Sequence, residues 1–194
     1  MLPAYDRTAR DLAYLSLGLL TSILALVVWI VALSLSLSLA ILIIGLPVMI
    51  GSAYVMRWTA DLDRRNAALV FGRPVRGHYR PHRSTTLFGR LSATLRDPQV
   101  WRDLAWLITH SVVGFVFGVL AITMVAGIGY LATMPLWFWA LPEGPEFGLW
   151  EADSLPWALI TASLAIPLAW VTPWVLRGLA KFHASLAAEL LGRH

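Results

Sequence analysis

The fold is decided by residues 12–56, which read LAYLSLGLLTSILALVVWIVALSLSLSLAILIIGLPVMIGSAYVM. No charged side chain interrupts these 45 residues. A helix of roughly 20 apolar residues crosses the hydrocarbon core of a bilayer, so this stretch is long enough for two crossings. Two further uncharged stretches, 104–141 and 154–176, are each long enough for one more. The sequence therefore predicts an all-α polytopic membrane protein, with four transmembrane helices near 10–33, 37–60, 98–133 and 155–185.

The predicted turn of the first hairpin lies at residues 34–38, where serine and leucine alternate. Strict alternation is typical of a strand. An isolated strand at membrane depth would leave its backbone polar groups without partners. We therefore expect a helix or a tight helical turn here.

Composition excludes most other classes of protein. Of the 194 residues 58% are hydrophobic and only 13% are charged, and the mean hydropathy is +0.70. With no cysteine, the chain has no disulfide, thiolate nucleophile or sulfur-ligated metal. The net charge of +4 could indicate nucleic acid, but membrane orientation and contact with anionic membrane lipid explain the arginines more simply.

The 15 basic residues all lie in the segments that would share one side of the membrane. They lie before residue 11, between residues 57 and 102, and after residue 176. The remaining polar segment, 142–155, holds four carboxylates and no base. Lys and Arg are retained in cytoplasmic loops. We therefore expect a multi-pass protein of the plasma membrane, with both termini cytoplasmic and the acidic loop outside.

The chain also repeats itself. RDLAYL at 10–15 recurs as RDLAWL at 102–107, displaced by 92 positions, and YVMR at 54–57 matches WVLR at 174–177, displaced by 120. These matches predict one membrane domain, 1–194, built from two tandem hairpins in the same orientation with cytoplasmic helix extensions. The boundaries of the parts are about 8–72 for the first repeat, 73–97 for a linker with an interfacial helix, and 98–192 for the second repeat.

The linker helix is expected near 86–96, where Leu87, Phe88, Leu91 and Leu95 would share one face. Such a helix could lie in the headgroup region or pack under the bundle. Asp97 followed by Pro98 is typical of a helix start, so we expect the third span to begin there.

No catalytic constellation is evident, and we expect neither an enzyme nor a cofactor. His110 is the only side chain in the uncharged stretches 12–56, 104–141 and 154–176 that titrates near neutral pH. We expect it to bond a backbone group or a neighbouring side chain rather than to move protons. His78 and His82 are four residues apart but lack a third ligand, so we expect no metal site.

Four small residues and two prolines predict helix geometry. Small residues let helix backbones approach closely in lipid, and a proline inside a helix frees a carbonyl and kinks it. The packing candidates serve either intramolecular contact or a homodimer seam, and they are Gly18, Ser22, Gly114 and Gly118. The expected kinks lie at Pro47 and Pro167.

The outer segment combines aromatic and acidic residues. Tryptophan at this depth usually anchors a helix in the interface. An aromatic patch beside carboxylates could also bind a cationic, partly apolar molecule. The candidate ligand or input residues are Trp137, Trp139, Glu143, Glu146, Trp150, Glu151, Asp153 and Trp157.

The order and spacing of these motifs resemble a known family. The two RDLA-aromatic-L elements, GLP at 45–47, PLWFWALP at 135–142 and TPWVLRGLA at 172–180 are similar to the "putative sensor" membrane domain of actinobacterial and archaeal proteins. The resemblance covers roughly residues 8–192. It implies the input domain of a two-component histidine kinase, here without the kinase part, so the chain is either free-standing or a fragment. The resemblance brings no defined ligand and no catalytic residue.

Two functions follow as expectations. The first is a non-catalytic signal-input module that passes an envelope or bilayer stimulus to a cytoplasmic or membrane partner, such as a histidine kinase. The alternative is an accessory or scaffold subunit of a larger membrane complex, such as a transporter.

Overall fold

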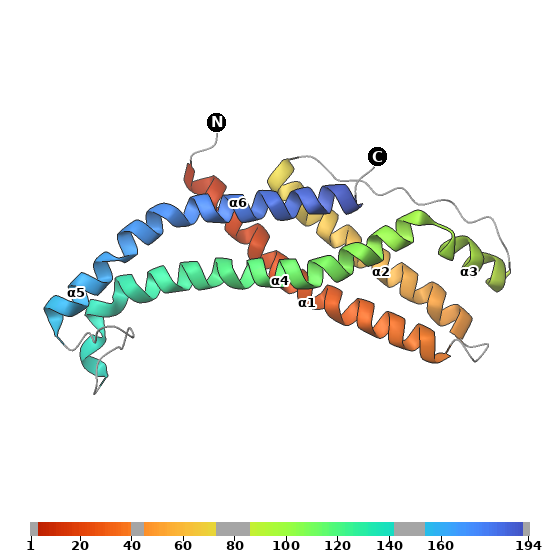
Figure 1. Ribbon diagram of the computed structural model, residues 1–194, viewed down its shortest axis with the longest axis horizontal. Helices are drawn as coiled ribbons and strands as arrows, with labels where there is room; N and C mark the ends of the chain where they lie inside the picture. Colours follow the sequence, from red (N-terminus) through yellow and green to blue (C-terminus); the bar gives the residue numbers. More distant parts are fainter. Residues whose placement is uncertain (1–3, 40–44, 73–85, 142–153, 192–194) are drawn as a thin grey trace.

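The computed structural model describes residues 4–39, 45–72, 86–141 and 154–191. Within these ranges the chain is all-α, as predicted, and contains no strand (Figure 1). Its elements are α1 (Ala4–Leu39), α2 (Gly45–Phe71), α3 (Leu87–Leu95), α4 (Pro98–Thr133), the 3-10 turns η1 (Met134–Leu136) and η2 (Phe138–Ala140), α5 (Leu155–Ser163) and α6 (Ala165–Leu191).

The long helices form two antiparallel hairpins that cross (Figure 1). One consists of α1 and α2, and the other of α4 with α5 and α6. The end of α1 and the end of α4 lie at opposite ends of the long axis of the molecule. The hairpins meet where α1 lies against both α2 and α4, and α6 contacts α4, α2 and α1. All four long helices therefore meet in one central region.

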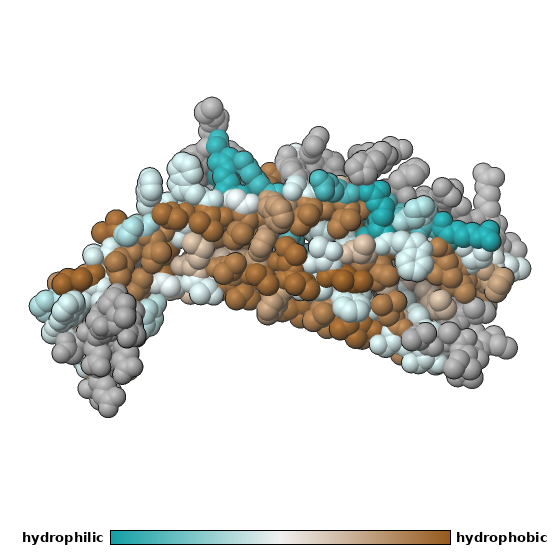
Figure 2. Space-filling view, viewed as in Figure 1, coloured by the Kyte–Doolittle hydropathy of each residue, from teal (hydrophilic) through white to brown (hydrophobic). Residues whose placement is uncertain are grey.

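Among the described residues, three segments are long and apolar enough to cross a membrane, namely Arg7–Ser36, Pro98–Leu136 and Leu155–Leu191. Apolar side chains cover most of the face shown in Figure 2, and hydrophilic ones follow one long edge. The fourth predicted span, 37–60, includes residues 40–44, which lie outside the described residues. In the described part of α2 the charged residues begin at Arg57.

Two predicted helix starts are confirmed by their capping geometry. Asp97 has an extended backbone, its carboxylate accepts a hydrogen bond from the Gln99 amide at 3.0 Å, and Pro98 is the first residue of α4. The Thr86 hydroxyl accepts from the Gly89 amide at 3.2 Å and caps α3. In both cases a side-chain oxygen satisfies an amide that has no partner inside the helix.

Other predicted boundaries were wrong. Residues 34–38 are helical, as expected, but α1 continues through them to Leu39 instead of turning. The predicted fourth helix is divided at Leu164 into α5 and α6. By contrast, α2 and α6 continue to Phe71 and Leu191, so the predicted helical extensions beyond the spans are confirmed.

Both prolines that were expected to kink a helix lie in the first turn of one. Pro47 is the third residue of α2, and the residues before that helix lie outside the described ones, so its kink stays a prediction. Pro167 lies in the first turn of α6, directly after the break at Leu164. Pro173, where no kink was expected, lies inside α6.

The central region is packed with small side chains. Ala60 and Ala67 of α2 and Ala180 and Ala184 of α6 are completely buried. In lipid there is little hydrophobic drive between helices, so close approach of backbones supplies much of the contact. These alanines bring the helices near enough for the few polar side chains between them to bond one another.

Candidate functional site

A continuous chain of buried polar side chains crosses the central region. The Tyr14 hydroxyl of α1 lies 2.6 Å from His183 Nδ1 of α6. The other ring nitrogen of His183, Nε2, lies 2.9 Å from His110 Nδ1 of α4. Three helices are thus joined by two consecutive hydrogen bonds.

The chain continues on the far side of His110. Its Nε2 lies 2.8 Å from the Thr21 hydroxyl and 3.4 Å from Asp63 Oδ1 of α2. The Trp106 indole donates to Asp63 Oδ2 at 2.8 Å, and its ring stacks on His110 with centroids 5.0 Å apart. We call Tyr14, Asp63, Trp106, His110 and His183 the polar centre. All five are at most 3% exposed.

A glycine on the same face of α4 leaves space for the ring of His110. Trp106, His110 and Gly114 follow one another at intervals of four, so they share one face of α4. A Cβ on Gly114 would lie 2.6 Å from both Cε1 and Nδ1 of His110. Only glycine therefore leaves the imidazole free to face His183.

The geometry couples the directions of these hydrogen bonds to one another. If Tyr14 donates to His183 Nδ1, the proton of His183 is on Nε2 and points to His110 Nδ1. The proton of His110 is then on Nε2 and points to Thr21 and Asp63. If His110 Nε2 instead accepts a hydrogen bond from the Thr21 hydroxyl at 2.8 Å, both imidazoles take the opposite tautomer. A histidine with one nitrogen occupied is restricted to one tautomer, so both rings reverse together.

Burial raises the pKa of Asp63 to about 6, although the hydrogen bond from Trp106 opposes the rise. Asp63 lies beyond the predicted span 37–60 and outside the three apolar segments. A carboxylate loses solvation when it is buried, so its neutral form is favoured. The carboxyl that ends the polar centre can therefore change its charge near neutral pH.

We expect Asp63→Asn to remove a pH dependence of stability. The folded carboxyl titrates near 6 and the unfolded one near 3.8. Its protonated form thus stabilises the fold fully below about pH 4, and this contribution is lost as the pH rises through about 6. The loss should reach at most about 3 kcal/mol, because one pKa unit corresponds to roughly 1.4 kcal/mol. Thermal unfolding in detergent at a series of pH values measures it. The exposed neighbour gives the control: Asp61→Asn should keep the native pH profile, and identical profiles for both variants would contradict the assignment.

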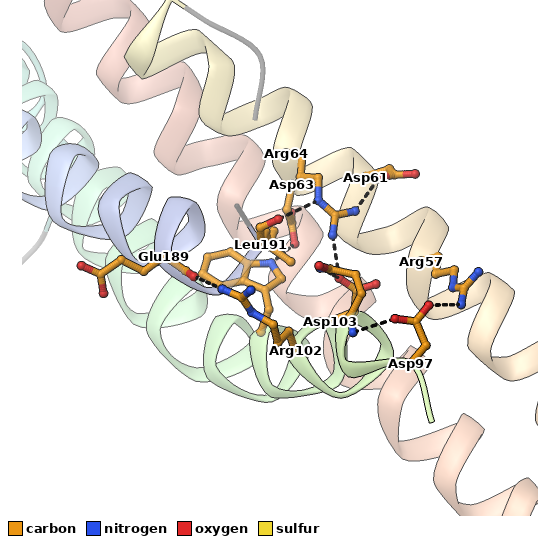
Figure 3. A network of polar contacts seen from close by, with 11 residues as sticks. Arg57, Asp61, Asp63, Arg64, Asp97, Arg102, Asp103, Glu189 and Leu191 are labelled. Carbon is orange, nitrogen blue, oxygen red and sulfur yellow. Dashed lines mark hydrogen bonds and ion pairs between the residues drawn. The ribbon is translucent and has the colours of Figure 1, made fainter. Parts of the chain in front are cut away.

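A layer of ion pairs lies beside the polar centre (Figure 3). The Arg64 guanidinium donates to Asp103 at 2.6 Å, and the Gln99 amide donates to the same carboxylate oxygen at 3.1 Å. Arg64 and Asp103 are both buried. A second pair joins Arg57 and Asp97 at 3.4 Å. The polar extension of α2 is thereby bound to the start of α4.

The same layer reaches the end of α6 (Figure 3). Arg102 donates to the Glu189 carbonyl at 2.7 Å, and Arg64 Nε donates to the Leu191 carbonyl at 3.5 Å. The last carbonyls of a helix have no partner inside it. The two arginines satisfy them and hold the end of α6 against α2 and α4.

The predicted input residues lie elsewhere. Trp137, Trp139 and Trp157 are at the loop end of the second hairpin, roughly 35 Å from His110 along α4. Trp139 is 74% exposed, whereas Trp137 is half-buried and donates to the Thr133 hydroxyl at 3.3 Å. The other five predicted residues lie outside the described residues: Glu143, Glu146, Trp150, Glu151 and Asp153. His78 and His82 do so as well.

Three of the four predicted packing residues lie between α1 and α4, namely Ser22, Gly114 and Gly118. A Cβ on Gly118 would lie 2.5 Å from Leu19 Cβ and 3.0 Å from the Leu15 carbonyl oxygen, whereas one on Gly18 would have nothing within 4 Å. Ser22 is buried, and its Cβ is 3.2 Å from the position of a Cβ on Gly114. These contacts are intramolecular, and the homodimer seam stays a prediction.

The sequence patterns did not reveal the polar centre. The expectation that His110 bonds a neighbouring side chain is confirmed by its bonds to Thr21 and His183, but the patterns gave no role to His183. One signal was available: the displacement of 92 aligns Tyr14 with Trp106, and that of 120 aligns Asp63 with His183. Two titratable residues at matching positions of a repeat were the clue.

Comparison with known proteins bears on the whole chain. A protein-family model described as "Putative sensor" matches residues 14–191. Comparisons with curated proteins and with solved structures gave no match. The matched range begins at Tyr14 and ends at Leu191, so it includes the complete polar centre.

Proposed function

Since the chain belongs to the family described as "Putative sensor", we propose that it is a non-catalytic signal-input module of a membrane. An envelope or bilayer stimulus changes the packing of its helices, and the cytoplasmic extensions pass this change to a protein partner. The observation that carries the proposal is the buried hydrogen-bond chain that joins all four long helices.

A signalling module needs two arrangements with different affinity for the stimulus. The polar centre supplies a candidate for this element, because its bonds can run in either direction. A displacement of α6 against α1 breaks the bond between Tyr14 and His183, and the loss then affects His110 and Asp63 in turn. Leaving a buried donor or acceptor without a partner costs about 1–3 kcal/mol. That cost favours two discrete arrangements over a continuous drift.

The output surface in this proposal is the polar edge formed by the ion-pair layer. Arg64 contacts both Asp103 and the Leu191 carbonyl, so movement of α6 changes the environment of a buried guanidinium. The input surface in this proposal is the aromatic-acidic outer loop, a hypothesis drawn from the sequence. The stimulus would act at the loop end of the second hairpin and change the contacts of the ion-pair layer at its other end.

The proposed topology is four spans with both termini and the middle segment in the cytoplasm. Because the chain lacks cysteine, a single Ser84→Cys variant reports this directly. In intact cells a membrane-impermeant maleimide should leave it unlabelled, and labelling should appear after the membrane is opened. An outer-loop variant such as Glu146→Cys is the control and should react in intact cells. Labelling of the first variant from outside would overturn the orientation and the positive-inside argument.

The proposal includes an internal duplication, in which two homologous helical hairpins form the chain. The aligned positions make reciprocal contacts: Tyr14 of the first half bonds His183 of the second, and Trp106 of the second half bonds Asp63 of the first. Two repeats in the same orientation, related by an axis along the membrane normal, would exchange contacts in this way. A superposition axis lying in the membrane plane would instead indicate an inverted repeat.

An accessory subunit of a larger membrane complex, such as a transporter, is the second candidate. The observation that favours it is the splayed arrangement of the hairpins (Figure 1), which leaves large apolar side chains such as Ile166 and Trp170 72% exposed. Contiguous exposed apolar surface often marks an interaction site, although lipid covers such residues equally well.

Purification of the full chain from its native membrane in mild detergent separates the two candidates. Recovery of a histidine kinase or response regulator supports the input module, whereas recovery of transporter subunits supports the accessory role. Once the partner is identified, its activity can be measured with and without the stimulus. His183→Ala should leave the complex intact but abolish the response of the partner to the stimulus. Ser185→Ala, an exposed site on the same helix, is the matched control and should respond normally. A normal response from His183→Ala would remove the polar centre from the mechanism.

A further inference from the structure

A groove between the start of α1 and the second half of α6 lies apart from the polar centre. It has a volume of about 420 Å³, and the described residues that line it all belong to these two helices: Arg7, Thr8, Asp11, Pro173, Trp174, Arg177, Gly178 and Lys181. On α6 the lining residues recur at spacings of three and four, so they share one helical face.

The charge of the groove is unbalanced. Three bases, Arg7, Arg177 and Lys181, face one carboxylate, Asp11, among the residues that line it. The matching arginine of the first repeat, Arg57, forms an ion pair with the buried carboxylate of Asp97. At the displacement of 92 residues the position matching Asp97 is Tyr5, which has no carboxylate. The second repeat thus leaves its arginine in an exposed position beside an open groove.

The surroundings of the groove are those of a membrane interface. Trp174 is 73% exposed, and Trp170, one turn earlier, is 72% exposed. The centroids of their rings are 6.3 Å apart. Tryptophans concentrate at the headgroup level of bilayers. The bases Arg177 and Lys181 follow on the polar side of these rings. The groove therefore places an apolar surface, which suits a lipid chain, beside positive charge, which suits a phosphate.

We propose that this groove binds the phosphate headgroup of an anionic membrane lipid. Arg7, Arg177 and Lys181 donate to the phosphate oxygens, Thr8 supplies a hydroxyl, and the acyl chain lies along Trp174. Arginine and lysine both bind phosphate, arginine through its planar fork and lysine as a point charge. Gly178 forms the floor, because a Cβ there would have nothing within 4 Å. The site does not depend on the signalling role.

Two variants test the proposal in different ways. Arg177→Gln with Lys181→Gln removes charge, while Gly178→Leu fills the groove and leaves every charge in place. A leucine is also a better helix former than glycine, so the second variant should fold. The control for charge is Arg65→Gln with Arg90→Gln, two exposed bases away from the groove. The control for size is Gly129→Leu, at an exposed glycine of α4 that likewise has nothing within 4 Å.

The full chain is reconstituted in nanodiscs of phosphatidylcholine with a photoactivatable phosphatidylglycerol, and the labelled peptides are mapped. We expect labelling on α6 and at the start of α1. The lipid fraction that gives half-maximal labelling should rise roughly 10- to 30-fold in the double charge variant, because each juxtamembrane base increases the affinity by a factor of roughly 3 to 5. Gly178→Leu should lose most of the labelling, and both controls should keep it.

Competition distinguishes the possible sources of the phosphate. Unlabelled phosphatidylglycerol should suppress the labelling, whereas inorganic phosphate at the same concentration should not. Suppression by inorganic phosphate would overturn the lipid assignment in favour of a soluble anion. Equal labelling of Gly178→Leu and the native chain, or equal losses in the double charge variant and its control, would show that only general surface charge attracts the lipid.

Discussion

Replacing Asp103 with alanine is expected to lower the free energy of unfolding by roughly 3–5 kcal/mol. That is the usual cost of removing one partner from a buried ion pair, since the other charge is left without compensation. Asp103 is completely buried, and Arg64, 2.6 Å away, is 3% exposed. Gln99, which donates to the same carboxylate oxygen, also loses a bond.

The same arginine provides the control. Asp61 also forms an ion pair with Arg64, but its side chain is 50% exposed. Exposed pairs contribute about 0–1 kcal/mol, so Asp61→Ala should have a small effect. Thermal unfolding in detergent, followed by circular dichroism, compares the two variants. Equal losses of stability for Asp61→Ala and Asp103→Ala would mean that the charge of Arg64, and not its burial with Asp103, decides the effect.

Gly118→Ala is expected to destabilise the crossing of α1 and α4 by roughly 1–3 kcal/mol. An added Cβ would lie 2.5 Å from Leu19 Cβ and 3.0 Å from both Leu19 Cα and the Leu15 carbonyl oxygen. Two of these neighbours belong to the backbone of α1, which cannot rotate away as a side chain can. Overpacking of this kind typically costs about 1–3 kcal/mol.

A second glycine of the same helix separates packing from helix propensity. Gly129 is exposed, and a Cβ added there would have nothing within 4 Å, so Gly129→Ala should be neutral or should stabilise α4 by up to about 1 kcal/mol. Opposite signs for the two substitutions are the expected result, measured as melting temperatures in the same detergent. If Gly118→Ala is stabilising as well, α1 and α4 do not pack as closely as these distances indicate.

The sequence by itself determined the all-α class and the apolar segments, because these depend on local composition. A long uncharged stretch must be helical in lipid, where every backbone amide and carbonyl needs a partner within the chain. The start of α4 was equally local: Asp97 and Pro98 specify it through one side-chain bond and one fixed dihedral angle. The family resemblance also rested on short motifs in order, and the match over residues 14–191 confirms it.

An error arose where the sequence pattern allows more than one structure. The turn expected at 34–38 is absent because α1 continues to Leu39. Serine and leucine alternation does not contain that information, since either a turn or a longer helix satisfies its backbone.

Only the tertiary structure decided the polar centre. Tyr14 and His183 are 169 residues apart and bond at 2.6 Å, and Asp63, Trp106 and His110 come from two further helices. Each of these residues has an ordinary neighbourhood in the sequence. Their burial, and with it the raised pKa of Asp63, exists only because small residues such as Gly114 and Ala184 let the helices cross closely. The chain specifies its helices locally, whereas the place where they meet depends on contacts summed over all four.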